Sequence, residues 1–87
     1  MMDAGECWRK LFNDWPQNLP RQGLLITTFN EAIPFVNFLV SEGILLVERD
    51  RPDSANARKV MVTFNAISAL KSTSPGDLTE FKVLGFE

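Results

Sequence analysis

The stretch that decides the fold is FVNFLVSEGILL, residues 35–46. Its first half alternates between two sides with the two-residue period of a strand packed mainly on one face. One of these sides is formed by Val36, Phe38 and Val40. Glu42-Gly43 then predicts a tight reversal, because glycine can adopt a positive φ without a steric penalty. Residues 44–47 follow as a second, more apolar strand, so the stretch predicts a β-hairpin.

Alternating or apolar runs on either side of this hairpin predict further strands. They cover residues 23–29, 59–64, 67–70 and, near the C-terminal end, 79–84. The segment between residues 48 and 59 is the most polar part of the chain and contains Pro52-Asp53-Ser54, a combination typical of a turn. Residues 50–57 are therefore predicted to form the tip of a long hairpin.

One helix is predicted, over residues 3–15. Asp3 can cap its N-terminus with Glu6 three residues further on, and Pro16 ends it. One face of this helix carries Trp8, Leu11, Phe12 and Trp15. This apolar face either covers an open face or end of the sheet, or it binds a partner through Trp8, Phe12 and Trp15. In the second case a protein partner is favoured over a membrane surface, because the polar side carries acids as well as bases.

Eighty-seven residues are enough for one domain with one core. We predict a mainly β domain (α+β by element count) over residues 1–87. It consists of the helix over 3–15, a five- to six-stranded antiparallel barrel over 23–71 and a C-terminal strand over 78–85. The predicted core comprises Trp8, Leu11, Phe12, Ile26, Val36, Phe38, Val40, Ile44, Leu46, Val60, Val62, Ile67 and Leu70.

This order, a helix and then short strands with a long polar connection between the third and fourth, resembles the Sm-like small barrel within the wider group of SH3-type barrels. The match covers about residues 8–71 in element order and spacing. The turn glycine, the strand-two glycine, the Asp…Asn pair and the Arg-Gly pair with which that family holds RNA are not matched. At those positions this chain carries Asn30-Glu31, Val36-Asn37, Glu42-Gly43 and Phe64-Asn65. The resemblance therefore implies the fold and edge-strand assembly, without RNA binding. A resemblance to an uncharacterised bacterial family of short proteins is also noted, although no motif carries it.

The chain holds no histidine and a single cysteine, Cys7. The lack of histidine removes the commonest general base and the commonest metal ligand, and it leaves Cys7 without a histidine to activate its thiol. The five glycines are dispersed and form no phosphate-binding loop. We therefore expect no enzymatic activity, no cofactor and no metal.

Composition also bounds the compartment. A single cysteine excludes an internal disulfide and favours a reducing environment. No cationic start precedes the apolar segment of a signal peptide. The uncharged run over residues 32–41 is far shorter than the roughly 20 residues needed to span a bilayer. We expect a cytoplasmic protein with no membrane contact, and the net charge of −2 provides no general attraction to nucleic acid.

The best candidate site is a basic set in the long hairpin, Arg49, Arg51, Arg58 and Lys59. If the flanking strands pair, these side chains come together near its base, where guanidinium groups can hold a phosphate or an acidic partner. The acids interleaved with them are Glu48, Asp50 and Asp53. Because these acids neutralise most of the field, solvated cross-strand ion pairing without a ligand is the alternative.

The leading functional hypothesis is a non-catalytic interaction or assembly module. A composition of 45% hydrophobic residues in so short a chain leaves apolar surface or strand edges to be covered. The expected partner is therefore another protein or a second copy of the chain. The alternative hypothesis is binding of nucleic acid or another polyanion through the basic hairpin, residues 49–59.

Overall fold

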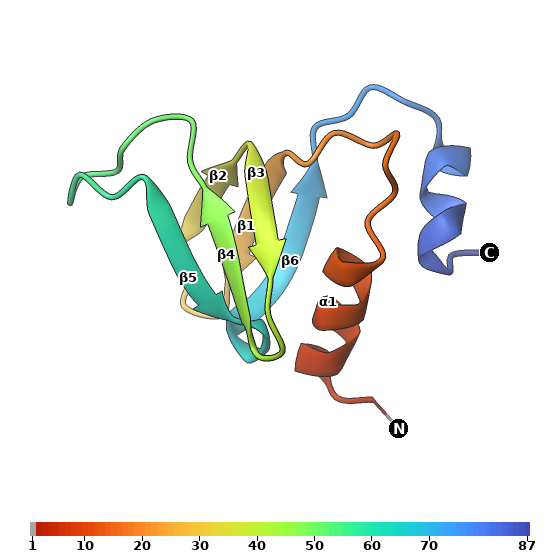
Figure 1. Ribbon diagram of the computed structural model, residues 1–87, viewed down its shortest axis with the longest axis horizontal. Coiled ribbons are helices and arrows are strands. Elements are labelled where there is room, and N and C mark those ends of the chain that lie inside the picture. The colour runs from red at the N-terminus through yellow and green to blue at the C-terminus, as the bar shows by residue number, and fades with distance from the viewer. Residues whose placement is uncertain (1) are drawn as a thin grey trace.

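The computed structural model describes residues 2–87. An N-terminal helix is followed by six antiparallel strands and a C-terminal 3₁₀ helix (Figure 1). The elements are α1 (Ala4–Asn13), β1 (Gly23–Thr27), β2 (Ala32–Phe35), β3 (Asn37–Val40), β4 (Ile44–Glu48), β5 (Lys59–Thr63), η1 (Phe64–Ala66), β6 (Ile67–Ser72) and η2 (Leu78–Leu84). The prediction of an N-terminal helix and a mainly antiparallel β domain is confirmed.

The six strands form two three-stranded sheets, in the orders β2-β1-β6 and β3-β4-β5. Val36 alone separates β2 from β3, so the chain passes from one sheet to the other at this residue. Within the described residues the two sheets do not close into the predicted barrel, and each keeps two edge strands. Figure 1 shows α1 on one side of the sheets and β5 on the opposite side, with η2 beyond α1.

The central hairpin is confirmed, with β3 and β4 paired and Leu39 opposite Leu46. Its turn is made differently from the prediction, because the only glycine with a positive φ among the described residues is Gly85. The Ser41 hydroxyl holds the reversal instead: it donates to the Ile44 carbonyl at 2.7 Å and accepts from the Ile44 N–H at 3.0 Å. A side-chain hydrogen bond thus replaces the left-handed glycine.

Helix α1 begins as predicted. Asp3 is its N-cap, and one carboxylate oxygen accepts from the Glu6 N–H at 2.8 Å, which satisfies one of the free donors of the first turn. The helix ends at Asn13, two residues before the predicted end, with Asp14 as C-cap ahead of Pro16.

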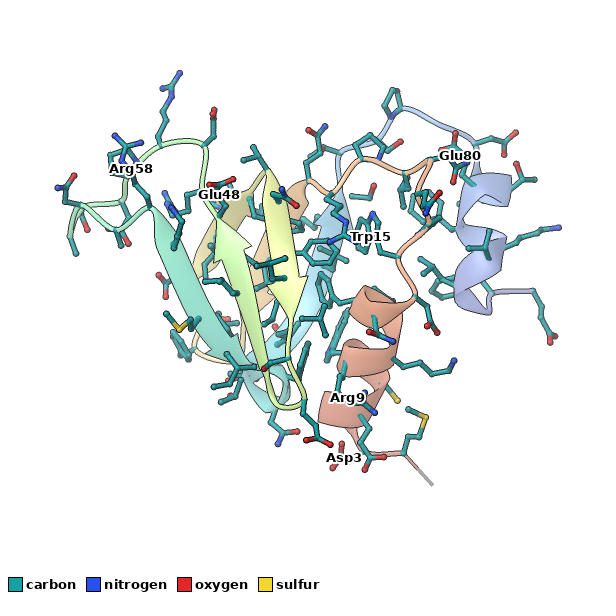
Figure 2. All side chains as sticks on the ribbon, viewed as in Figure 1. Asp3, Arg9, Trp15, Glu48, Arg58 and Glu80 are labelled. Carbon is teal, nitrogen blue, oxygen red and sulfur yellow. The ribbon has the colours of Figure 1, made fainter. Side chains whose placement is uncertain are left out.

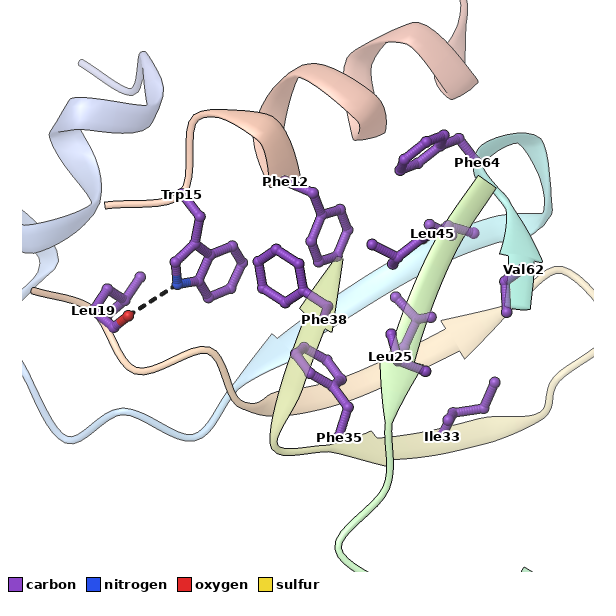
Figure 3. Close-up of a cluster of buried hydrophobic side chains, with 12 residues drawn as sticks. Phe12, Trp15, Leu19, Leu25, Ile33, Phe35, Phe38, Leu45, Val62 and Phe64 are labelled. Atoms are coloured by element: carbon purple, nitrogen blue, oxygen red, sulfur yellow. Dashed lines mark hydrogen bonds between the residues drawn. The ribbon is translucent and has the colours of Figure 1, made fainter. Parts of the chain in front are cut away.

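Phe12 lies at the centre of an aromatic cluster between α1 and the sheets (Figure 3). Its ring stacks on Trp15 with centroids 5.6 Å apart and meets Phe38 edge-on at 5.0 Å. Two further rings, those of Phe35 and Phe64, each lie 6.5 Å from it. A helix this short is marginal by itself, so packing of these rings against the sheets holds it in place.

The linker between α1 and β1 is anchored at two points. The indole N–H of Trp15 donates to the buried carbonyl of Leu19 at 3.0 Å (Figure 3). Further along, the guanidinium of Arg21 donates to the Phe38 carbonyl at 3.0 Å and lies 4.5 Å from the centre of the Phe38 ring. A segment that reads as a polar connector therefore ties the helix to the edge of β3.

The predicted core was partly wrong, because in several strands the structure buries the side opposite to the predicted one. Phe12, Phe38, Val62 and Ile67 are buried as predicted, and the half-buried predicted residues Trp8, Leu11, Val40, Val60 and Leu70 pack against the core. In contrast, the structure buries Leu25, Phe35, Leu45 and Val47 in place of the predicted Ile26, Val36, Ile44 and Leu46. Runs such as residues 24–26 and 44–47 are apolar on both sides of the strand. A two-residue period therefore does not indicate which side is buried, and the register with the neighbouring strands determines it.

The strand predicted over residues 78–85 is also wrong, because residues Leu78–Leu84 form the 3₁₀ helix η2. The Asp77 side chain accepts from the Thr79 N–H at 3.3 Å, and Gly85 ends the helix with φ at 101°. Asp77 and Gly85 are thus helix caps at the two ends of the segment. The segment forms a helix despite the weak alternation of apolar and polar residues that predicted a strand. Phe81 packs against the core from this helix.

Candidate functional site

The most distinctive surface of the molecule is the outer face of the β3-β4-β5 sheet, on the side away from the core. Three cross-strand rows of side chains cover this face because the strands are in register. The middle row is apolar and contains Leu39, Leu46 and Met61. The row toward the long hairpin is polar and contains Asn37, Glu48 and Lys59. Ile44 and Thr63 begin the third row, next to the Ser41 turn.

The apolar row is open to solvent. Leu39 is 66% exposed and Met61 is 71% exposed, and Leu46 between them is half-buried. Ile44, at 43% exposure, extends the apolar surface toward the turn. Shallow hollows lie on both sides of the row, one reaching Val40 and the other reaching the charged row. An apolar row of this kind is a surface that a partner can cover.

The polar row carries one ion pair. The Lys59 ammonium lies 3.8 Å from a Glu48 carboxylate oxygen, and both side chains are about half exposed. Such a pair contributes little to stability because water screens it. Its effect is to turn Lys59 toward β4, so that its charge lies over the face of the sheet.

The long hairpin brings the predicted basic residues to one end of β4 and β5. The Arg49 N–H donates to the Arg58 carbonyl at 2.7 Å, which extends the ladder beyond the strands. Figure 2 places Arg58 and Glu48 at this end of the molecule. The Arg49 side chain donates to the Arg51 carbonyl at 3.0 Å, and the side chains of Arg51 and Arg58 are exposed. The four bases therefore lie around the base of the hairpin, with Lys59 paired to an acid.

Asp53 organises the tip of this hairpin. One of its carboxylate oxygens accepts from the N–H groups of Ala55 and Ala57, at 2.9 and 2.8 Å. The bond from Ala57 is the main reason that the pKa of Asp53 lies below its ordinary value, with Arg49 contributing a smaller attraction. Asp53, one of the acids interleaved with the bases, thus holds the backbone of the loop tip. Its negative charge also offsets the positive charge nearby.

The predicted partner face of α1 points mostly inward. Phe12 is 1% exposed and Trp15 is 7% exposed. Trp8 is half-buried and lines a hollow with Leu11 and Phe81, between α1 and η2. The burial of these rings agrees with the interpretation in which the helix covers the sheets, and not with the one in which this face binds a partner.

A second group of exposed apolar side chains lies at the C-terminal end, with Leu78, Val83 and Phe86. They stand on or beside the seven-residue η2. The Cys7 thiol is exposed on α1. Within residues 2–87 no three acidic or cysteine side chains are placed to share a metal ion.

None of the helices within residues 2–87 has the length and the continuous apolar character of a bilayer span. Comparison with known proteins finds no family model, no curated protein and no solved structure that matches the chain. The proposal for the function therefore depends on the fold and on the surfaces described above.

Sequence reasoning missed the outer face of the β3-β4-β5 sheet. Leu46 and Ile44 were assigned to the core, and Leu39 and Met61 to the opposite side of their strands. The available signal was that both sides of β4 are apolar, which a strand with one solvated face does not require. An apolar residue on each of three neighbouring strands then forms a row once the register is known.

Proposed function

We propose that this chain is a non-catalytic interaction or assembly module, and that its binding surface is the outer face of the β3-β4-β5 sheet. The observation that supports this proposal is the exposed apolar row of Leu39, Leu46 and Met61. The row lies on a rigid sheet between a charged row and a hydroxyl-bearing turn, which is the pattern of an apolar centre with a polar rim that protein interfaces use. The C-terminal apolar group stands on or beside a single short helix and, in the part of the chain that the structure describes, is not bordered by a cross-strand polar row.

Within this proposal the two sheets, which do not close within residues 2–87, are an open relative of the SH3-type small barrels. The order of helix, bent strand, long hairpin, tight turn and last strand supports the assignment. Here β2 and β3 are the two parts of a strand bent at Val36, and η1 is the tight turn before β6. Small barrels of this kind serve many binding functions, so the fold supports the class of function and the exposed row supports the location.

The proposal is tested by site-specific photo-crosslinking in the native cell. A photoreactive phenylalanine analogue replaces Leu39 on the outer face, or Phe29 in the turn between β1 and β2. The two positions are matched, with exposures of 66% and 67%. We expect crosslinked adducts from position 39 and few from position 29. Adducts from neither position, or equal yields from both, would overturn the proposal.

A second candidate function is binding of nucleic acid or another polyanion through the basic hairpin. The observation that favours it is the backbone pairing of Arg49 with Arg58, which gathers four bases at one end of the sheet. Against it, Glu48 and Asp53 lie among these bases. Binding of this kind depends strongly on salt and responds to removal of Arg51 and Arg58.

A further inference from the structure

The four edge strands of the two sheets are not equally protected. At β2 the residues whose backbones face outward are Ala32 and Pro34, because Thr27 and Glu31 form a hydrogen-bonded position and the pattern alternates from there. Proline has no N–H to offer a new strand. At β3 the outward residues are Phe38 and Val40, and the groups of Phe38 are already bonded: Asn37 accepts from its N–H at 2.9 Å and Arg21 donates to its carbonyl at 3.0 Å.

The edge of β6 lies beside helices. Leu70 and Ser72 line a hollow together with Trp8, Leu11, Trp15 and Phe81, which come from α1, its C-terminal end and η2. Covering an edge with a helix is a common protection against pairing with another chain. Each of these three edges is thus at least partly blunted, bonded or covered.

Within residues 2–87 the edge of β5 is the least protected of the four. Arg49 bonds to Arg58, and the Phe64 N–H donates to the Gly43 carbonyl, at the two ends of the β4-β5 pair. Because ladder bonds alternate along an antiparallel pair, Val60 and Val62 bond to β4. The outward N–H and C=O groups of β5 belong to the other three residues, Lys59, Met61 and Thr63. The Lys59 ammonium lies 3.8 Å from a Glu48 carboxylate oxygen on the neighbouring strand, so its charge is partly offset at this edge.

We propose that a second copy of this chain occupies the β5 edge, in an antiparallel β5-β5 pair with Met61 on the two-fold axis. This inference rests on the assembly part of the proposed function: it adds a second copy at the edge beside the outer face and leaves that face open. The register follows from charge. Placing Lys59 on the axis would oppose two ammonium groups, whereas placing Met61 there sets Lys59 against Thr63 of the other copy and pairs all three outward residues.

The two-fold pair joins two three-stranded sheets into one of six strands. The apolar row then runs without interruption across both copies, since Met61 of each chain meets its equivalent and Leu46 and Leu39 follow on each side. Met61, the most exposed member of the row at 71%, is the residue that the second copy covers most. A two-fold interface between identical edges is closed, so it predicts a dimer rather than a fibre.

Disulfide trapping tests this geometry. In a Cys7→Ser background, Met61→Cys places two thiols across the axis, where paired residues have Cα atoms about 5.5 Å apart, within the range that a disulfide spans. The matched control is Leu39→Cys, which is equally exposed. It lies two strands from β5, so its two copies are about 24 Å apart at about 4.8 Å per strand. We expect disulfide-linked dimers of the first variant to form at least about tenfold faster than those of the control.

Edge substitutions give an independent measurement by sedimentation equilibrium, from micromolar to near-millimolar protein. Met61→Pro removes an outward N–H without breaking a bond to β4, whereas Met61→Thr keeps that N–H. We expect dimers of the intact chain and of Met61→Thr, and at least about tenfold weaker dimerisation of Met61→Pro. Far-ultraviolet circular dichroism checks that all three are folded.

The outcomes separate this inference from the proposed function. A monomeric intact chain, or equal trapping at positions 61 and 39, overturns the dimer. If position 39 still crosslinks other proteins in the cell, the interaction module stands with a different partner. If neither a dimer nor any crosslink forms, both proposals are wrong.

Discussion

Replacing Phe12 by alanine tests whether α1 is part of the core or a free binding face. The Phe12 ring is 1% exposed and has five aromatic neighbours with centroids within 6.5 Å. A ring buried this far removes about 170 Å² of mostly apolar surface from water, which at about 25 cal/mol per Å² corresponds to about 4 kcal/mol. Measured losses for such substitutions are about 3–5 kcal/mol.

A domain of this size has a free energy of unfolding on the order of 5 kcal/mol, so Phe12→Ala is expected to retain only about 1 kcal/mol, with roughly one molecule in six unfolded without denaturant. Phe12→Leu gives a measurable intermediate. It keeps much of the volume and loses the ring contacts, for about 1–2 kcal/mol, which lowers the melting temperature by about 4–16 °C. The control is Phe29→Ala, at 67% exposure, with an expected change within about 0.5 kcal/mol.

The assay is urea unfolding followed by tryptophan fluorescence, because Trp15 stacks on Phe12 and reports directly on the cluster. Equal m-values for the intact chain and Phe12→Leu would show that the same surface is exposed on unfolding. If Phe12→Ala costs no more than Phe29→Ala, the helix is not docked. The apolar face of α1 would then be free for a partner, and the placement of the binding surface on the β3-β4-β5 sheet would lose its support.

Three further outcomes are expected. Trp15→Phe leaves the buried carbonyl that accepts its indole hydrogen bond without a donor and lowers the free energy of unfolding by about 1–3 kcal/mol, measured by urea unfolding followed by far-ultraviolet circular dichroism because the substitution removes the fluorescent reporter. Because the Ala57 N–H bonds to the ionised carboxylate, the pKa of Asp53 lies below 3.8; the bond is present at neutral pH and is lost as pH falls through the lowered pKa. The Ala57 amide signal in NMR should titrate with a midpoint below 3.8, and a midpoint at or above this value contradicts the assignment. For the polyanion alternative, Arg51→Ala with Arg58→Ala should weaken duplex DNA binding and reduce the log–log salt slope by about 1.8, and no binding of the intact chain at low salt removes that alternative.

Locally encoded elements could be predicted from the sequence. The capping aspartate at position 3, the apolar face centred on Phe12 and the stop at Pro16 predicted α1 to within two residues. The central hairpin and the long polar hairpin also follow from alternation and turn composition. Each of these depends on residues that are close in the chain, whose conformational preferences act before any tertiary contact forms.

Only one part of the candidate surfaces, the basic hairpin, could be predicted from the sequence. The gathering of Arg49 and Arg58 follows from strand pairing, and the structure has that pairing. The apolar row of Leu39, Leu46 and Met61 does not follow, because it requires the relative register of three strands. A shift of one residue in any strand would move its member of the row to the opposite face.

The sequence by itself determined where the helix and the hairpins lie, since capping, period and turn chemistry act over a few residues. Only the tertiary structure decided which side of β4 is buried, that residues 78–84 form a helix, and that β5 has an open edge. The physical reason is that both sides of the ILLV run can be buried equally well. The choice between them is made by the aromatic cluster around Phe12, whose members come from distant parts of the chain.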